Sequence, residues 1–405
     1  MMRKGDDSKK RTNYIVPITN PHTLTLCTIN NKHLLILLTV IILTLSSCKL
    51  EETNLTGYIS DNTIQLDKIN LKESFNIEIF AENINNPRSL ALGNNKTIYA
   101  GSKNAGNVYK IKYNENMKVA NIETIASNLN MPNGISYNNN QLYVVENNRI
   151  ILFKTPHNSS EYVIINENLP NENHHGWRYS RIGPDGKLYI SIGAPCNICE
   201  KEEPFATISR LNNDNEIETY VKGVRNSVGF DWDNNGRLWF TDNGRDWLGD
   251  DIPGDELNRA DAAGLHFGFP YCHNNDLKDP DYNKGKDCQR YTEPKQILGP
   301  HVAALGMRFN HYSRNITNNF PLEYNNTIFI AEHGSWNRKV PIGYRITIVK
   351  LDTNNNPTSY NVFADGWLND DKAWGRPVDI LFLEDGSMLI SDDKANAIYR
   401  IYYKD

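Results

Sequence analysis

The chain lacks the features that would mark several large classes of protein. It has no basic stripe and no arginine-rich run; its 43 Lys and Arg against 48 Asp and Glu give a net charge of −5, spread along the sequence. This argues against a nucleic-acid partner. No long stretch follows the 3.6-residue apolar period of a helical protein. Aromatic residues are plentiful, however, with 7 Trp, 21 Tyr and 13 Phe, so the chain can bury a sizeable core and is not disordered as a whole.

The longest apolar run, Leu34 to Leu45, is too short to span a bilayer comfortably and follows a basic stretch, as in a signal peptide. It ends in Leu45-Ser46-Ser47-Cys48, which resembles a bacterial lipobox. The resemblance implies cleavage before Cys48 and lipidation of this cysteine; an uncleaved anchor and an ordinary signal peptide are the alternatives. We therefore predict a signal peptide over 1–47, a linker over 48–74, and export to the periplasm or cell surface, as an outer-membrane lipoprotein that touches the membrane only through its lipid.

Few cysteines remain once Cys27 and Cys48 are set aside. The four that remain are Cys196, Cys199, Cys272 and Cys288, and an even number in an oxidising compartment favours disulfides. Cys272 and Cys288 bracket a loop of about 15 residues, whose closure would contribute roughly 3 kcal/mol. A four-cysteine zinc site is the alternative. No His follows the Cys196-to-Cys199 motif, which excludes c-type haem attachment, and no thioredoxin-like context favours a redox-active pair.

From about residue 75 the sequence repeats a pattern of short strands separated by polar turns. Several copies carry Asp-Gly or Asn-Gly before the second strand, the strongest short-range signal of a hairpin. The first copies recur at roughly 45 residues, near the length of a four-stranded propeller blade. Six copies predict an all-β, six-bladed propeller of antiparallel blades over 75–405. The copies begin near these residues or segments: Pro87, Pro132, Arg178 with Gly183-Pro184-Asp185-Gly186, Asp233-Asn234-Asn235-Gly236, Ala304 to Leu351, and Arg376 with Glu384-Asp385-Gly386.

The first strand, Phe75 to Phe80, is expected to close the ring by joining the last blade, which would cover exposed strand edges. The repeat also aligns five polar residues at one offset of the innermost strands: Arg88, Asn133, Arg178, Asn226 and Arg376. They would either converge on the central channel or bond the turns between blades. Three arginines facing one channel favour an anionic ligand.

Several long motifs point beyond a generic propeller. They are His174-His175-Gly-Trp-Arg178, Gly223-Val-Arg225-Asn226, Thr241-Asp-Asn-Gly244-Arg245 with Gly254-Asp255-Glu256-Leu-Asn258, Tyr271-Cys272-His273, Glu332-His-Gly-Ser-Trp-Asn-Arg338 and Gly375-Arg376-Pro-Val-Asp379. Together they resemble the sorbosone dehydrogenase-like branch of the sugar dehydrogenases that use pyrroloquinoline quinone (PQQ). The pyranose dehydrogenases and the soluble glucose dehydrogenase are relatives of that branch.

The resemblance implies oxidation of a sugar or related carbohydrate, with hydride transfer to PQQ and electrons passed to an external carrier. His175 matches the family's general base, and a histidine suits proton removal near neutral pH. Arg225, Asn226 and Arg376, with Arg88 and Arg178 from the repeat, are the expected cofactor-binding residues. The backbone carbonyls of Gly244 and Arg245 match those that hold the PQQ calcium (Ca²⁺). Asp255 and Glu256 match a pair that holds a structural calcium, although acidic turns are more often merely solvated.

The sequence departs from the glucose enzyme at three places. His174 stands where an aspartate is thought to orient the base, and Val378 replaces one of two paired arginines. The family's quinone-binding lysine falls near Gly334, where Arg338 or Lys339 could substitute. Two other functions stay open: a calcium-dependent propeller hydrolase of the lactonase type, which would want carboxylates at the converging offset, and a non-catalytic surface-binding propeller.

Overall fold

The computed structural model describes residues 63–156, 161–311 and 320–404. The predicted signal peptide over 1–47 and the predicted lipidation site Cys48 lie outside the described residues. Within the described part, strands dominate and the helical elements are three short 3₁₀ turns, η1 (Leu66–Lys68), η2 (Cys288–Arg290) and η3 (Leu322–Tyr324). No helix there is long and apolar enough to cross a membrane.

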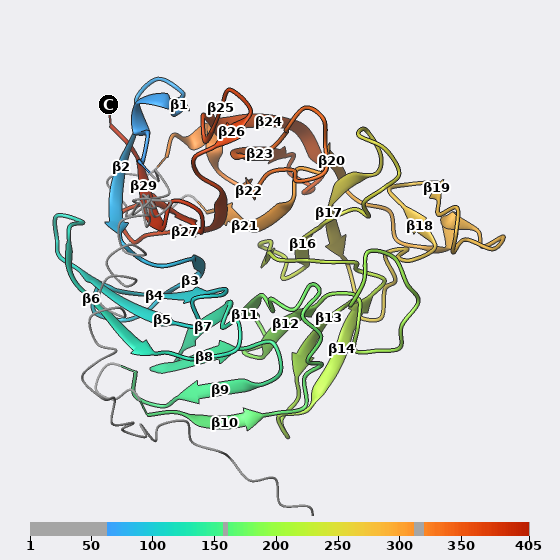
Figure 1. Ribbon diagram of the computed structural model, residues 1–405, viewed down its shortest axis with the longest axis horizontal. Coiled ribbons are helices and arrows are strands. Elements are labelled where there is room, and N and C mark those ends of the chain that lie inside the picture. The colour runs from blue at the N-terminus through green and yellow to red at the C-terminus, as the bar shows by residue number, and fades with distance from the viewer. Residues whose placement is uncertain (1–62, 157–160, 312–319, 405) are drawn as a thin grey trace, which may run out of the picture. The chain divides into compact units, whose positions relative to one another are not determined.

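The described residues form a six-bladed β-propeller, as the repeat predicts, and Figure 1 shows its sheets arranged around a centre. The first three blades each contain four consecutive antiparallel strands. Their strands are β3 (Pro87–Leu92), β4 (Thr97–Ser102), β5 (Val108–Tyr113) and β6 (Val119–Ala126); β7 (Gly134–Asn138), β8 (Gln141–Val145), β9 (Ile150–Phe153) and β10 (Val163–Asn166); and β11 (Ser180–Ile182), β12 (Leu188–Ile192), β13 (Thr207–Leu211) and β14 (Ile217–Lys222).

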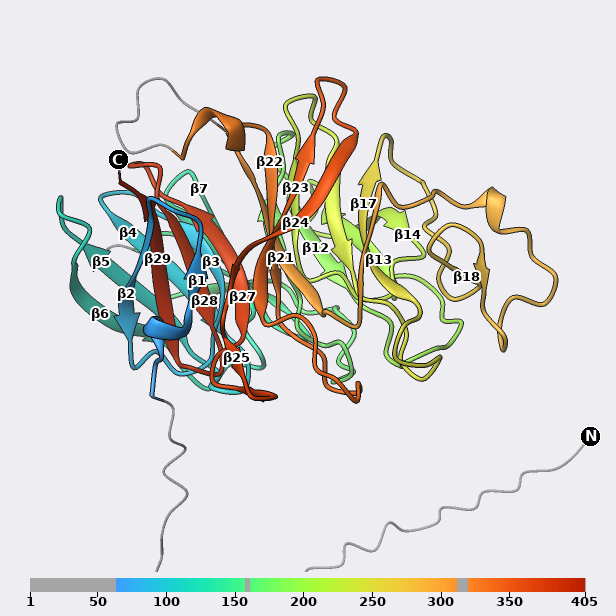
Figure 2. The same cartoon turned by 90° about the horizontal axis from the view of Figure 1, so that it is seen from above.

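The fourth and fifth blades depart from simple succession. In the fourth, a hairpin of β18 (Cys272–His273) and β19 (Leu277–Lys278) is inserted before the outermost strand, and it projects from the rim of the ring in Figures 1 and 2. The fifth gains β1 (Asn70–Leu71), which lies in the predicted linker, as an extra outer strand. The remaining strands are β15 (Phe230–Trp232), β16 (Leu238–Asp242), β17 (Gly254–Ala260) and β20 (Gln296–Pro300); then β21 (Ala304–Asn310), β22 (Thr327–Glu332), β23 (Arg345–Leu351) and β24 (Pro357–Asp365).

The sixth blade closes the ring as predicted. Its outer strand is β2 (Phe75–Glu82), which pairs antiparallel with β29 (Ala397–Tyr403) and so joins the two ends of the described chain. The inner strands are β27 (Pro377–Phe382) and β28 (Met388–Asp392), and a small hairpin of β25 (Leu368–Asn369) and β26 (Lys372–Ala373) precedes them. Closure in this way removes two strand edges that would otherwise be open to pairing with other chains.

Local sequence explains these hairpins. The β7–β8 turn is the pair Asn139-Asn140, with φ of 48° and 62°, the conformation that two-residue hairpins favour and asparagine tolerates. Gly186 has φ of 76° in the predicted Asp-Gly turn of the third blade. The second strands, such as β4 and β16, are buried along their whole length because neighbouring blades cover both faces. The core clusters between the first and second blades and between the fourth and fifth blades accordingly draw side chains from both neighbours.

Candidate active site

A cavity of about 530 Å³ lies where the connections between blades meet at one end of the ring. Its walls come from the starts of innermost strands, the ends of second strands and the loops between blades. The lining side chains include four cations, two carboxylates and four histidines. They are Arg88, Lys103, Arg225 and Arg376; Asp246 and Asp255; and His174, His175, His301 and His333. The cavity is therefore rich in positive charge and in titratable rings.

The structure splits the five polar residues that the repeat aligns. Arg88, Asn226 and Arg376 line the cavity, whereas Asn133 and Arg178 do not. Arg178 is almost fully buried, and its guanidinium donates to the carbonyls of Asn147, Pro170 and His175. Arg178 therefore holds the connections between the second and third blades, which is one of the two roles that the sequence left open. Because it does not line the cavity, the structure gives no support to the expected contact with a cofactor.

His175 is the best-defined acid–base group of the cavity. It is 8% exposed, and its Nδ1 lies 2.7 Å from the carbonyl oxygen of Ala194. Because a carbonyl can only accept, Nδ1 carries the proton and Nε2 keeps a free lone pair. Burial, followed by the charges of Arg225 and His174, holds the pKa of His175 well below its ordinary value of 6.5. The imidazole is therefore neutral, and able to accept a proton, at neutral pH.

The backbone around His175 is shaped for this contact. His175 has φ of 51°, an uncommon conformation for a residue with a side chain. Gly193 lies against it so closely that a Cβ there would be 2.7 Å from the Cβ of His175. Ala194 follows Gly193 in the chain, and its carbonyl orients His175. In the glucose enzyme this role is thought to belong to an aspartate at the position of His174. Sequence reasoning missed this partner because a backbone carbonyl has no residue signature.

Three arginines are held rigidly at the cavity wall. Arg225 is buried and donates to the carbonyls of Asn197 (2.8 Å) and Asn243 (3.1 Å). Arg376 donates to the carbonyls of His333 (3.0 Å) and Gly334 (2.8 Å). These bonds satisfy part of each guanidinium with neutral acceptors, and Arg225 also forms an ion pair with the lining carboxylate of Asp246 at 3.4 Å.

Arg88 is tied to a second cluster that the sequence did not reveal. Its guanidinium lies 2.8 Å from a carboxylate oxygen of Asp393, and the Nε2 of His333 lies 2.8 Å from the other. Burial lowers the pKa of His333 to about 4, although Asp393 opposes the shift. The pKa of Asp393 lies well below its usual range, because His333 and Arg88 outweigh the effect of burial. His333 stood inside a motif of the resemblance but carried no assigned role.

Lys103 is a further cation that sequence reasoning missed. It follows β4 and lines the cavity, with its Nζ 4.2 Å from the centroid of the Trp177 ring. Burial and the charge of Arg88 lower its pKa to about 8, so it is still mostly protonated at neutral pH. Arg338 and Lys339, the expected substitutes for a quinone-binding lysine, are not among the lining residues. Position along the repeat gives no signal for Lys103, since it lies outside the aligned offset.

The two acidic residues expected to share a calcium face different cavities. They are neighbours on β17, and successive strand residues point to opposite sides. Asp255 lines the main cavity and accepts from the backbone N–H of Gly244 (2.9 Å) and Ala304 (3.0 Å), whereas Glu256 lines a small cavity behind it. Burial raises the pKa of both to about 7. In the described part of the chain, no group of three or more His, Cys, Asp or Glu side chains is arranged to hold a metal.

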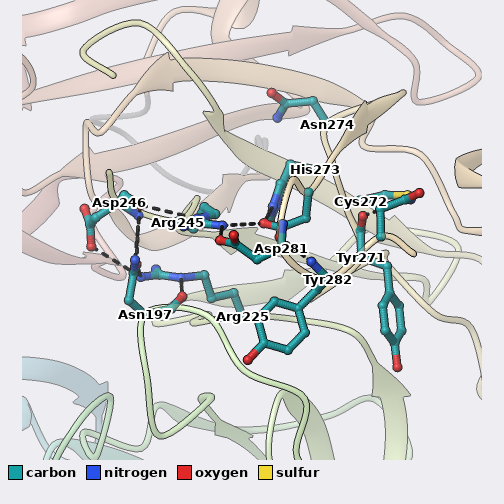
Figure 3. Close-up of polar contacts among 12 residues, drawn as sticks. Asn197, Arg225, Arg245, Asp246, Tyr271, Cys272, His273, Asn274, Asp281 and Tyr282 are labelled. Atoms are coloured by element: carbon teal, nitrogen blue, oxygen red, sulfur yellow. Dashed lines mark hydrogen bonds and ion pairs between the residues drawn. The ribbon is translucent and has the colours of Figure 1, made fainter. Parts of the chain in front are cut away.

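The two backbone carbonyls expected to bind the PQQ calcium accept no hydrogen bond from the described residues. Within the described residues, no hydrogen-bond donor reaches the carbonyl oxygens of Gly244 and Arg245. Gly244 lines the main cavity, while Arg245 does not; the side chain of Arg245 pairs instead with Asp279 (2.6 Å) and Asp281 of the inserted segment. Figure 3 shows Arg245 and Asp281 beside His273.

The four cysteines predicted to form disulfides do so, and the structure gives the pairing that the sequence left open. Cys272 and Cys288 join within the inserted segment of the fourth blade, and Cys196 joins Cys199 across two residues. The disulfide between Cys196 and Cys199 encloses Asn197, whose side-chain oxygen accepts a hydrogen bond from Arg225 at 2.8 Å. Figure 3 shows Asn197 between Arg225 and Asp246. The pairing excludes a zinc site made of these four cysteines.

Comparison with known proteins shows which families this chain resembles. A family model described as glucose/sorbosone dehydrogenase matches residues 142–332, and one described as TrAA12-like matches residues 277–404. A protein of Borreliella burgdorferi, described as uncharacterized, is 35% identical over 367 residues, covering 85% of this chain and 95% of that protein. The glucose/sorbosone dehydrogenase match covers just under half of this chain and points to a sugar-oxidising oxidoreductase.

Several solved structures share the fold of this chain at low identity. The Trichoderma reesei protein of carbohydrate-active enzyme family AA12 is 19% identical, with TM-scores of 0.72 for its iodide structure and 0.71 for its calcium structure; these cover 83% of this chain and 98% and 97% of theirs. The holo PQQ domain of a Coprinopsis cinerea pyranose dehydrogenase is 16% identical, with a TM-score of 0.69, and covers 82% of this chain and 97% of its own.

Proposed function

We propose that the protein oxidises a carbohydrate with PQQ and Ca²⁺ held in the main cavity, with His175 as the general base. One observation carries the proposal: four cationic side chains and a neutral, oriented histidine line the same cavity. A metal-dependent hydrolase of the lactonase type would instead want a carboxylate-rich centre, and a binding module would have no need of an oriented base.

The charge of the cavity fits the cofactor. PQQ carries three carboxylates. Four cations line the cavity with two carboxylates, one of which, Asp255, has a pKa of about 7, and Arg88 is also paired with Asp393, which is not among the lining residues. Arg225, Arg376, Arg88 and Lys103 would bind the carboxylates, with Asn226 supplying an amide. The printed descriptions of the similar fungal structures, a holo PQQ domain and a calcium structure, support the same pair of cofactors. Arg178 is left out of this set because its guanidinium is bonded to turns.

The base follows from the hydrogen bonds of His175. When bound, the quinone supplies the electrophile that accepts a hydride, with its electron pair, from a carbinol carbon. Nε2 of His175 would take the hydroxyl proton of that carbinol, leaving a carbonyl. The carbonyl of Ala194 keeps Nδ1 protonated throughout, so Nε2 alone changes its protonation state. The low pKa keeps the base ready at neutral pH but makes the imidazolium short-lived.

The calcium would be held by oxygen atoms that the structure leaves available. The free carbonyls of Gly244 and Arg245 and the carboxylate of Asp255 are hard oxygen donors of the kind calcium prefers. A nearby cation would stabilise the buried carboxylate, whose charge is otherwise disfavoured by burial. A separate structural calcium at Glu256 would need backbone oxygens of the small second cavity.

Location and electron flow complete the proposal. The sequence holds no Cys-x-x-Cys-His haem motif, so electrons would leave to a separate external carrier. The lipobox-like Cys48 supports export and anchoring through lipid alone, at the periplasmic side or the cell surface.

Reconstitution tests the function directly. Purified apoprotein is mixed with PQQ and CaCl₂, bound quinone is followed by absorbance, and dye reduction is assayed with aldoses, sorbosone and polyols. We expect stoichiometric quinone binding and reduction with at least one sugar. The variant His175→Gln should bind quinone normally and lose at least about 100-fold in kcat, the range typical of general bases. Absence of both quinone binding and dye reduction in the wild type would refute the proposal.

A further inference from the structure

Two tryptophans stand exposed at the mouth of the cavity. Trp247 and Trp336 are each 66% exposed, and their rings pack edge to face with centroids 5.3 Å apart at 87°. Trp336 lines the cavity, whereas Trp247 does not, so the pair runs from the cavity wall to the outer surface. Large aromatic side chains left in water are costly, and adjacent ones usually mark a binding surface.

The loops that carry the two rings are fastened to each other. Nδ2 of Asn337 donates to a carboxylate oxygen of Asp246 at 2.9 Å, and the guanidinium of Arg338 lies 3.2 Å from the carboxylate of Asp251. Each tryptophan is therefore next in sequence to a residue of the first bond. A platform fixed in advance loses little conformational entropy when a ligand binds.

The surroundings of the pair indicate the class of ligand. The C–H face of a pyranose ring packs well on an indole, while its hydroxyls need amide and carboxylate partners at the edge of that ring. Asn337 and Asp246 supply these groups beside the tryptophans, and both line the cavity. A lipid surface with anionic headgroups would meet the carboxylates of Asp246 and Asp251 next to the two rings, which disfavours it.

We propose that Trp336 and Trp247 form a second sugar-binding subsite just outside the cavity, so that the favoured substrate is an oligosaccharide of at least two rings. The inference rests on the proposed oxidation of a sugar inside the cavity. One ring would occupy the reacting position near His175, and the next would stack on the exposed indoles. A monosaccharide would use only the inner position.

Kinetics with sugars of increasing length test the subsite. For the reconstituted enzyme, kcat/KM is measured with glucose, cellobiose, cellotriose, maltose and maltotriose. We expect at least one oligosaccharide to exceed glucose. Trp247→Ala should lower the ratio of oligosaccharide to glucose kcat/KM about three- to tenfold, as loss of one aromatic stacking contact predicts. The matched control is Val340→Ala, which removes a 67% exposed apolar side chain and should leave the ratio unchanged.

Calorimetric titration of the same saccharides into wild type and Trp247→Ala separates this proposal from the proposed function. If saccharide binding depends on Trp247 but the protein oxidises no sugar, the proposed subsite is supported and the proposed activity is refuted. Oxidation with equal ratios and equal binding in both proteins would overturn the subsite. An effect of Trp247→Ala confined to electron transfer to a cytochrome, absent with a small dye, would also overturn it and identify a protein-docking surface instead.

Discussion

Asn197 holds two parts of the proposed cofactor site at once. Its side-chain oxygen accepts from a guanidinium nitrogen of Arg225 and from the backbone N–H of Asp246, both at 2.8 Å. Its amide donates to the carbonyl of Asp246 at 3.1 Å. The disulfide between Cys196 and Cys199 encloses this residue and limits its motion. Truncating Asn197 to alanine should therefore loosen Arg225 without touching the cavity lining.

The expected loss follows from the bonds that remain. In Asn197→Ala, Arg225 keeps the backbone oxygen of residue 197 (2.8 Å), the carbonyl of Asn243 (3.1 Å) and the carboxylate of Asp246 (3.4 Å), but its charged guanidinium loses the bond to the side-chain oxygen of residue 197. Such a bond contributes about 1.5–3 kcal/mol. A loss of about 2 kcal/mol in quinone binding corresponds to a roughly 30-fold weaker Kd.

Fluorescence titration of PQQ into apoprotein with excess calcium measures this change. Asn197→Asp is the matched control, because it keeps an oxygen for Arg225 and for the N–H of Asp246 and should weaken binding only a few-fold. Scanning calorimetry of the apoproteins separates a local effect from unfolding. An Asn197→Ala protein that is stable and binds quinone within twofold of wild type would refute the reasoning, as would equal losses in both variants.

Three further outcomes follow. Burial and the charge of Arg225 keep the pKa of His175 well below 6.5, so kcat/KM should stay level as the pH falls from about 8 to 6.5 and decline only at lower pH. In the variant His174→Asp, the new carboxylate favours the imidazolium form of His175 and should move that decline to higher pH. Calcium at about 100 times its Kd should raise the free energy of unfolding by about 2.7 kcal/mol in calorimetry, and Asp255→Asn should abolish most of the gain, whereas equal gains would exclude Asp255 as a ligand. Replacing both Cys272 and Cys288 by alanine should lower the free energy of unfolding in urea by about 3 kcal/mol, and a loss under about 1 kcal/mol would contradict the loop-closure account.

The sequence predicted the architecture well because the signals for it are local and repeated. Turn residues and alternating strands recur in every blade, and the leftover strand at Phe75 needed a partner that only the last blade could offer. The inserted hairpin of the fourth blade was harder, because its outer strand β20 follows β17 only after 35 residues that carry no repeat signal.

Site residues were predicted where the repeat or the family resemblance marks their positions. They were missed where only the three-dimensional arrangement brings a residue to the cavity. Arg88 and Arg178 share one offset, yet only Arg88 lines the cavity, because three backbone carbonyls bind the guanidinium of Arg178. Lys103 and the carbonyl of Ala194 lie outside any aligned offset. Such roles depend on distances between segments far apart in the chain, which a single sequence does not encode visibly.

Ring closure by β2 sets an order of events during synthesis. Glu78 on β2 bonds to Arg400 on β29, which lies 322 residues later. At 5–20 residues per second, β2 emerges roughly 16 to 64 s before its partner exists. The sixth blade is consequently completed only after the last strand has been made. A chain truncated before β29 would leave both β2 and β28 with open edges, so even a short C-terminal loss should expose the whole ring to misassembly.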